Sequence, residues 1–369
     1  MTINVPLVDL KAQYASIKDQ MDKTILGVVE STQFINGPEV SGFEEEYATA
    51  VGAEKCVGVA SGTGALMLAL KACDIGPGDE VILPSHTFAA TGEAVAVLGA
   101  TPVFVDLEQD GYCMDPEGFS DAITERTKAV IPVHIYGHPV DMGRINEIAK
   151  ANGLYVIEDA AQAHLAQWDG ATCGSLGDLA CFSFFPGKNL GAYGDAGGVT
   201  GKSGELIEKV RQLRDHGRSS KYVHEIVGYG ERLDALQAAI LRVKLPHLSD
   251  WTKQRNRLAE RYLQHLSDLP LELPKTKNAA YHAYHLFVVQ TDDRDNLLKA
   301  LNERGIGAGI HYPIPLHLQP AFKSSKYELG ALPRVERVAN RILSLPLFPE
   351  MSEMQQDHVI HTIKETIAS

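Results

Sequence analysis

At 369 residues the chain is longer than one hydrophobic core normally fills, so its length predicts a large domain together with a smaller one. Its content of 44% hydrophobic and 22% charged residues is typical of a globular protein and argues against a disordered one. The formal net charge of -13, with no basic run in the sequence, argues against a nucleic-acid partner, although a local pocket can still bind an anionic small molecule.

The first part of the chain, to about residue 50, is predicted to be helical. It contains one amphipathic helix from Ala12 to Thr32 and, after a Gly-Pro turn, a second helix to about Val51. Short apolar strands then alternate with helices; the expected strands are 56–60, 80–83, 101–105, 129–134 and 154–158, and the expected helices are 62–73, 89–98 and 142–151. This alternation predicts a mainly parallel sheet covered by helices on both faces, with ligands at the carboxyl ends of the strands.

The strands become interrupted by glycines from Leu179 onward, and a strong apolar helix is expected at 233–245. A long helix at 250–269 is expected to lead into a smaller α+β part, with a strand at 285–290 and a helix at 295–304. The predicted fold is therefore α/β, with a large domain at 1–250 and a small C-terminal domain at 251–369.

The sequence carries no sign of export or of a membrane span. No apolar run approaches the roughly 20 residues needed to cross a bilayer, and the first residues lack the basic and apolar regions of a signal peptide. The five cysteines are an odd number without a C-x-x-C pair, which is typical of free, buried thiols in a reducing compartment. We expect a cytoplasmic protein without a membrane partner.

Lys188 is unusually placed for a charged residue. It lies in a short loop bounded by Pro186 and Gly191, after an apolar strand pattern that reaches Phe184. Burial among such neighbours would lower the pKa of its amine and make it a usable nucleophile. The alternative is a lysine whose stem covers apolar surface while its amine reaches water, and this segment alone favours neither.

Two further segments suit a bound anion and a buried charge. Ser61 to Ala65 is a small-residue turn at the start of a helix, whose free N–H groups could bind a phosphate, although helix capping explains the turn equally well. Asp159 ends a buried strand pattern, where a carboxylate needs a cation, a metal or a helix to cap. His164 is a poor lone metal ligand, so no metal site is expected.

Ser183 and Phe88 complete a set of groups that suits one cofactor. The Ser183 hydroxyl precedes Lys188 by five residues, so the two side chains could reach a phosphate and a carbonyl carbon of one small molecule. Phe88 follows another expected strand and could stack on a flat ring, although core packing is the more common role of a single aromatic residue. A reactive amine, a buried carboxylate, a phosphate-binding turn and a stacking ring are together what pyridoxal 5'-phosphate (PLP) requires.

The chain resembles the nucleotide-sugar aminotransferase family of fold-type I PLP-dependent enzymes. The matching motifs extend over nearly the whole sequence, at residues 5–10, 34–40, 61–65, 76–81, 158–164, 183–195 and 311–319. The resemblance implies that residues 1–250 form the PLP-binding domain, that Lys188 forms the Schiff base with PLP, and that Asp159 faces the pyridine nitrogen. It further implies that Gln162 binds the ring hydroxyl, that Phe88 stacks on the ring, and that the phosphate is held by Ser183, Gly62 and Thr63.

The reaction that this resemblance implies is amino transfer from L-glutamate to a keto group of a nucleotide-linked sugar, in amino-sugar biosynthesis. PLP would alternate with pyridoxamine 5'-phosphate (PMP) during turnover. The segment from Gly309 to Gln319 is the expected lid, with His311, Tyr312 and His317 as substrate residues, although His317 could instead be a surface histidine. Its motif favours a 3-keto deoxysugar or a 3-keto uronate as acceptor over a 4-keto sugar. The family also implies a homodimer with shared active sites.

Two positions depart from the family pattern. Gly230 stands where relatives commonly have an asparagine that reaches a phosphate in the neighbouring subunit, and Leu165 stands where a glycine is usual. Lys188 argues against a PLP-dependent sugar dehydratase, in which a histidine replaces the lysine, and no cysteine lies in a loop suited to a desulfurase. A regulatory protein that keeps PLP without turnover stays open as an alternative.

Overall fold

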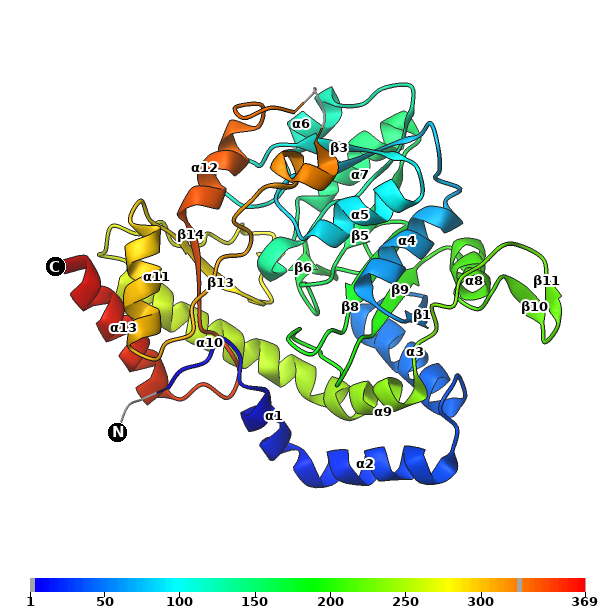
Figure 1. Cartoon of the computed structure of the whole chain (residues 1–369), viewed down its shortest axis with the longest axis horizontal. Coiled ribbons are helices and arrows are strands. Elements are labelled where there is room, and N and C mark those ends of the chain that lie inside the picture. The colour runs from blue at the N-terminus through cyan, green and yellow to red at the C-terminus, as the bar shows by residue number, and fades with distance from the viewer. Residues whose placement is uncertain (1–3, 324–326, 369) are drawn as a thin grey trace.

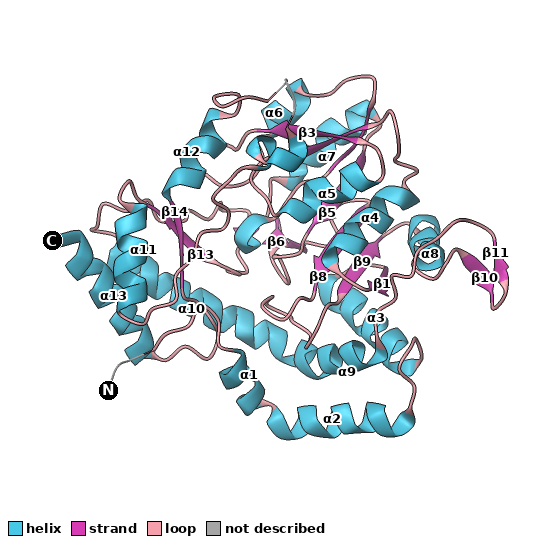
Figure 2. Ribbon diagram, in the orientation of Figure 1, coloured by secondary structure: helices cyan, strands magenta, loops and turns pink. Residues whose placement is uncertain are grey.

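The computed structural model describes residues 4–323 and 327–368, and its centre is a seven-stranded sheet (Figures 1 and 2). In spatial order the strands are β1 (Lys55–Val59), β9 (Gly197–Gly201), β8 (Leu179–Ser183), β5 (Tyr155–Asp159), β4 (Thr127–Val130), β2 (Glu80–Pro84) and β3 (Thr101–Val105). β9 runs antiparallel to both of its neighbours, whereas the other pairs are parallel. The mostly parallel α/β sheet predicted from the sequence is therefore confirmed.

Helices precede, separate and follow these strands along the chain, and side-chain caps mark where several of them begin. They are α1 (Leu10–Ser16), α2 (Lys18–Ser31), α3 (Pro38–Val51), α4 (Gly62–Ala72), α5 (Ala89–Val97), α6 (Pro116–Asp121), α7 (Met142–Asn152), α8 (Gly204–Leu213), α9 (Ala235–Lys244), α10 (Leu248–Leu266), α11 (Arg294–Glu303), α12 (Pro333–Arg341) and α13 (Glu353–Ala368). The Ser61 hydroxyl accepts a hydrogen bond from the Gly64 N–H at the start of α4. The Asp141 carboxylate does the same for the Arg144 N–H at the start of α7. Both caps satisfy N–H groups that the helix itself leaves free.

Both faces of the sheet are covered because successive side chains of a strand point to opposite sides. In β8, Leu179 and Cys181 join the larger apolar cluster, to which α4 and α8 contribute. Ala180 and Phe182 point the other way, into a cluster with side chains of α3 and α9. The polar residue Ser183 then ends the strand where the apolar layers end.

The N-terminal segment forms two helices where the sequence predicted a single one. The chain turns at Ile17, between α1 and α2, and the Ile17 side chain is buried against Met21, Ile240 and Val243. Two of these partners belong to α9, beside which α2 runs (Figure 1). The break therefore serves a contact with a distant helix, which apolar spacing within the segment does not reveal.

Residues that follow α9 build a separate apolar core. α10 leads into it, and the antiparallel pair β13 (Phe287–Gln290) and β14 (Ile342–Leu345) packs there with α11 and α13. Val5 joins the same core and pairs with Ile306 in a parallel bridge. The chain near its N-terminus is thereby attached to the C-terminal part.

Short strands also lie outside the central sheet. β12 (Ala280–Tyr281), β6 (Gln167–Trp168) and β7 (Ala171–Thr172) form a small three-stranded sheet. β10 (Arg218–Ser220) and β11 (Val223–His224) form a hairpin that projects from the rest of the chain (Figure 1). Among the described helices, none combines the length and the apolar character needed to cross a membrane.

Two strands differ from the sequence prediction by more than one residue at an end. β4 stops at Val130 rather than at His134, and Pro132 just beyond it has no N–H to donate to a strand ladder. β13 begins at Phe287 rather than at His285, because the His285 N–H donates instead to the Tyr136 carbonyl at 2.8 Å. That hydrogen bond brings His285 to the loop that follows β4.

Candidate active site

A cavity of about 680 Å³ lies at the carboxyl ends of β2, β5 and β8, where the C-terminal part of the chain meets the sheet. Most of the site residues predicted from the sequence line it, namely Gly62, Thr63, Phe88, Asp159, Gln162, Ser183, Lys188, His311 and Tyr312. His317 does not. The fold thus brings together residues that lie far apart in the sequence, from Gly62 to Tyr312.

Lys188 follows β8 in a tight loop. Its N–H donates to the Phe185 carbonyl at 2.9 Å, and a Cβ at Gly191 would lie only 2.3 Å from the Pro186 oxygen, so this turn requires glycine. The side chain is half-buried, and within residues 4–323 and 327–368 its amine has neither a hydrogen bond nor an ion pair. Burial lowers the pKa of Lys188 to about 8, although the nearby carboxylate of Asp159 opposes this shift. The amine is therefore available for chemistry.

Asp159 ends β5 and is buried beneath the cavity. The Thr91 hydroxyl donates to one carboxylate oxygen at 2.7 Å, and the Ala161 N–H donates to the other at 3.2 Å. Burial nevertheless raises the pKa of Asp159 above its usual value. No cation of the described chain pairs with this carboxylate at contact distance, so a ligand that brings a positive charge would relieve the cost of burying it.

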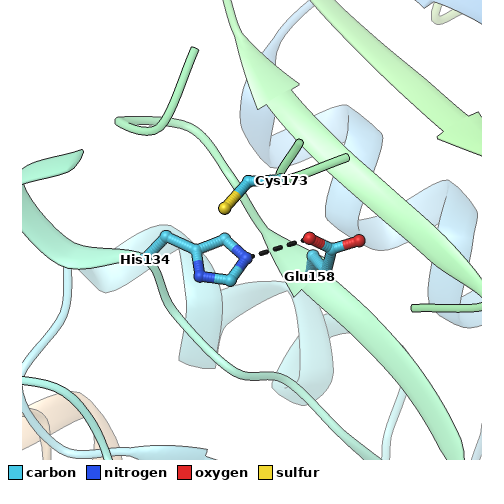
Figure 3. Close-up of side chains that lie close together, drawn as sticks. All are labelled: His134, Glu158 and Cys173. Atoms are coloured by element: carbon cyan, nitrogen blue, oxygen red, sulfur yellow. Dashed lines mark hydrogen bonds and ion pairs between the residues drawn. The ribbon is translucent and has the colours of Figure 1, made fainter. Parts of the chain in front are cut away.

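Glu158, one residue earlier in β5, forms a buried cluster with His134 and Cys173 (Figure 3). The His134 ring accepts the Val140 N–H at Nδ1, so its Nε2 carries the proton and donates to Glu158 at 3.0 Å. Burial raises the pKa of the Cys173 thiol, which therefore stays protonated. The carboxylate of Glu158 also accepts backbone N–H groups from Gly174, Leu176 and Gly177. With its polar atoms satisfied by protein, this group anchors β5 and so positions Asp159.

Gln162 connects the end of β5 to the segment of Tyr312. The Tyr136 N–H donates to the Gln162 carbonyl oxygen at 2.6 Å, which fixes the orientation of the amide. The amide nitrogen then donates to the Tyr312 hydroxyl at 3.2 Å. Tyr312 also contacts Phe88, with 5.6 Å between ring centroids, and Phe88 is 54% exposed, so its ring faces the cavity rather than the core.

The start of α4 forms an anion-binding corner of the cavity. Ser61 caps Gly64, whereas the N–H groups of Gly62 and Thr63 lie in the first helical turn and have no partner within the helix. A Cβ at Gly62 would lie 2.7 Å from the Cβ of Ser183, so only glycine lets the Ser183 hydroxyl approach this helix end. A phosphate group suits this combination of free N–H groups, positive helix end and hydroxyl.

The histidines of the predicted lid occupy different environments. His311 lines the cavity, its Nδ1 lies 2.9 Å from the Ser344 hydroxyl oxygen, and its carbonyl accepts a hydrogen bond from the Tyr136 hydroxyl. His317 is 1% exposed, and its two ring nitrogens contact Ser85 at 2.6 Å and Glu336 at 3.1 Å. The ring of His317 therefore anchors the segment to the end of β2 and does not reach the cavity.

The two departures from the family pattern also have structural correlates. Leu165 has a φ of 61°, in the left-handed region that favours glycine, and it does not line the cavity. Gly230 lies beside His216, whose Cε1 would be 3.3 Å from an added Cβ. The imidazole of His216 thus occupies the space next to Gly230, which the family pattern did not indicate.

Sequence reasoning gave no role to several residues of the cavity wall, among them Arg255 and His285. Arg255 is buried, and its guanidinium donates to the carbonyls of Tyr284 and Leu347 at 3.1 and 2.8 Å. The only signal for it was an arginine on the apolar side of the predicted helix at 250–269. His285 had no signal, because the strand prediction made it the first residue of a regular strand.

A family model described as the DegT/DnrJ/EryC1/StrS aminotransferase family matches residues 15–364. The chain is 46% identical over 365 residues to dTDP-3-amino-3,4,6-trideoxy-alpha-D-glucose transaminase of Streptomyces venezuelae. This match covers 99% of this chain and 96% of that protein. The chain is 47% identical over 363 residues to UDP-N-acetyl-3-dehydro-alpha-D-glucosamine 3-aminotransferase of Acidithiobacillus ferrooxidans, covering 98% of each.

The fold is equally close to that of a solved structure. The crystal structure of Streptomyces venezuelae DesV in complex with a ketimine intermediate matches with a TM-score of 0.98 at 45% identity, over 100% of both chains. These likenesses confirm the aminotransferase resemblance and the fold-type I architecture that the motifs implied. The chain belongs to the DegT/DnrJ/EryC1/StrS aminotransferase family.

Proposed function

We propose that this protein is a PLP-dependent aminotransferase that moves the amino group of L-glutamate to the C3 keto group of a nucleotide-linked sugar. One observation carries the proposal: a lysine amine and a buried carboxylate, neither with an ion-pair contact in the described chain, share a cavity with a free helix N-terminus. The printed names of the two relatives, a dTDP-3-amino-sugar transaminase and a UDP-sugar 3-aminotransferase, support position 3 as the site of transfer.

The cavity fits the cofactor of this family, which a solved relative holds as PMP. The free N–H groups at the start of α4 suit its phosphate, and the unpaired carboxylate of Asp159 suits a protonated pyridine nitrogen. When bound, PLP supplies a carbonyl carbon that joins amines and a cationic ring that accepts electrons from an adjacent C–H bond.

Each predicted residue then has one role. Lys188 would hold the cofactor through its Nζ, and its amine would take the proton from the α-carbon of the amino donor. Asp159 would keep the pyridine nitrogen protonated, and Gln162 would bind the ring hydroxyl. Phe88 would stack on the ring, whereas Gly62, Thr63 and Ser183 would bind the phosphate.

The sugar nucleotide enters beside Tyr312 and His311, which line the cavity at its small-domain side. The Tyr312 hydroxyl, held by Gln162, can bind a sugar hydroxyl or the keto oxygen. A 4-keto sugar is the competing acceptor. His317 is assigned no contact with the substrate, because its ring is committed to Ser85 and Glu336.

The proposal is tested by following the cofactor absorption of the purified protein. Glutamate should convert the spectrum of the lysine-bound cofactor to that of PMP, and a suitable keto sugar should reverse the change. UDP-, dTDP- and GDP-linked 3-keto and 4-keto sugars then identify the acceptor. A spectrum that responds to no amino donor would instead support a PLP-binding regulatory protein.

Lys188→Ala should lose the absorption of the lysine-bound cofactor and reduce turnover by about 10²–10⁴-fold, because it removes the amine that moves the proton. Lys209→Ala is the matched control, since this lysine pairs with Asp74 on the surface and should leave turnover unchanged. Undiminished turnover by Lys188→Ala would refute the mechanism.

The proposal includes a cytoplasmic homodimer built from chains with two domains, 1–250 and 251–369. The two apolar cores, one around the central sheet and one after α9, support this division. Apolar side chains are exposed on α2 and on the hairpin β10–β11, such as Leu26 and Tyr222, and this exposure supports a dimer in which a second copy of the chain covers them. Nucleic acid is not a proposed partner, because the chain is acidic.

A further inference from the structure

We propose that Arg255 binds a carboxylate group of the amino donor through the edge of its guanidinium that carries Nε and Nη2. The inference rests on the proposed function and deepens it, because it names the side chain that would hold glutamate in the cavity of Lys188. No motif of the sequence indicated this arginine, which belongs to α10 and lines the same cavity as Lys188.

The protein itself uses only one nitrogen of the Arg255 guanidinium. Nη1 donates to the carbonyls of Tyr284 and Leu347 at 3.1 and 2.8 Å and makes a longer hydrogen bond to the His285 carbonyl at 3.4 Å. Nε is buried without a hydrogen-bond partner, and Nη2 has none either among residues 4–323 and 327–368. These two nitrogens form an edge that can donate two parallel hydrogen bonds to one carboxylate.

The positive charge of Arg255 has no counter-ion at contact distance. The residue is only 4% exposed, and burial lowers its pKa to about 10, so the guanidinium stays charged at neutral pH. The carboxylate of Glu350 opposes this shift, but no ion pair joins the two side chains in the part of the chain that the structure describes. A buried cation without a partner is costly, and an anionic ligand would remove this cost.

Arg255 is also the cation that the cavity leaves for a substrate. Among the described residues of the cavity wall, the lysine and arginine side chains are Lys188 and Arg255, and the cofactor would occupy Lys188. Burial lowers the pKa of His285 and of His311, so both rings are neutral at pH 7. His134 is already paired with a carboxylate of β5. An anionic substrate group therefore finds its charge partner at Arg255.

The surroundings of Arg255 suit a planar, terminal anion near the lysine. Its guanidinium contacts the His285 carbonyl, and the His285 ring lies 3.1 Å from the side chain of Asn189, the residue after Lys188. An amino-acid carboxylate matches the planar fork and can be enclosed by it. The diphosphate of a sugar nucleotide instead continues to a nucleoside, which needs an open path. A uronate carboxylate shares the donor's chemistry, and the experiment separates the two.

The test titrates glutarate, a dicarboxylate without an amino group, into the full-length protein loaded with PLP and measures the heat of binding. Arg255→Gln should weaken glutarate binding by about 10- to 150-fold, because hydrogen bonds between two charged groups are lost. Arg255→Lys keeps the charge but not the fork and should weaken binding by at least about fivefold. Arg261→Gln, at an arginine of the same helix that pairs with Asp357, is the matched control and should leave binding unchanged.

Arg255 also holds backbone carbonyls, so its replacement can lower the stability of the fold. The unfolding midpoint of each cofactor-free chain is therefore measured with and without glutarate. A purely structural role predicts a lower midpoint in Arg255→Gln with the same upward shift on adding glutarate, whereas the proposed role predicts that this shift is lost. If Arg255→Gln does not fold, Arg255→Lys decides in the same way.

UDP-glucuronate supplies a carboxylate from the sugar side, and Arg255→Gln should leave its affinity unchanged. A loss for UDP-glucuronate that equals or exceeds the loss for glutarate would overturn the assignment to the amino donor. Unchanged glutarate binding in a folded Arg255 variant would overturn the inference altogether. Glutarate that binds through Arg255 in a protein without amino transfer would instead overturn only the proposed function.

Discussion

Lys188 and Asp159 share one property: the fold opposes the charged form of both side chains. Burial lowers the pKa of Lys188 to about 8 and raises the pKa of Asp159. Structural ion pairs in a folded protein normally compensate such costs, yet neither residue has an ion-pair partner in the described chain. Two side chains at one cavity whose charged forms are both disfavoured are typical of a site that a ligand completes.

The substitution Asp159→Asn should therefore stabilise the cofactor-free chain while it impairs the enzyme. A carboxyl group whose folded pKa is raised binds its proton more tightly in the folded state, so its ionisation destabilises the fold as pH rises above the unfolded pKa. The asparagine removes this cost at neutral pH. The amide oxygen can still accept the Thr91 hydroxyl.

Calorimetry of the cofactor-free chains should show a higher midpoint for Asp159→Asn at neutral pH, and the difference should shrink in acid, where Asp159 is protonated. Turnover should fall by about 10²–10³-fold, because a charge that stabilises the reacting centre is lost. Asp74→Asn, at an exposed carboxylate, is the control. Equal midpoints at both pH values would contradict the argument.

Elements whose signal is local were predicted well from the sequence. The strand at 101–105 was predicted with its observed bounds, and the cap and helix after Ser61 were predicted to within a residue at the C-terminal end. Residues at strand ends were located for the same reason, since parallel strands deliver their carboxyl ends to one edge. Asp159, Ser183 and Phe88 consequently meet in the cavity.

Features that depend on distant contacts were not predicted. The break at Ile17 serves packing on α9, and the early departure of His285 from its strand serves a hydrogen bond to Tyr136. His317 was placed at the substrate by its motif, whereas burial with Ser85 and Glu336 removes it from the cavity. No local pattern encodes these pairings, because each joins segments that are far apart in the chain.

The contact between α4 and β8 gives a prediction at the scale of elements. Gly62→Ala would place a Cβ 2.7 Å from the Cβ of Ser183 and 3.2 Å from its Cα, so the helix end and the strand end must separate. Overpacking of this kind costs about 1–3 kcal/mol, which corresponds to about 5- to 150-fold weaker cofactor binding if the cost falls on the phosphate corner.

Equilibrium binding of PLP to cofactor-free protein measures this effect. Gly204→Ala is the matched control, because it also lies in the first turn of a helix, α8, and its Cβ would meet nothing within 4 Å. Similar dissociation constants for the two variants would show that the phosphate does not bind where α4 meets Ser183.

Apolar side chains that are exposed on the single chain bear on the oligomeric state of the protein. Tyr222 and Val227 are 81% and 89% exposed in and beside the projecting hairpin β10–β11 (Figure 1). Exposed side chains of this size at two nearby positions are unusual for a monomer surface and typical of an interface. Leu26 and Val29 on α2, together with Phe34 and Ile35 after it, add further uncovered apolar area.

We therefore expect a particle of two chains in analytical ultracentrifugation, and the double substitution Tyr222→Asp with Val227→Glu should shift it to one chain, because each buried carboxylate would lack a partner. Met354→Glu introduces the same charge at an exposed position of α13, away from the hairpin, and should leave the dimer intact (Figure 1). If the active sites are shared, the dissociated variant should also lose turnover while its secondary structure by circular dichroism is retained. A wild-type chain that sediments as a monomer, or a double variant that stays dimeric, would contradict the role assigned to the hairpin.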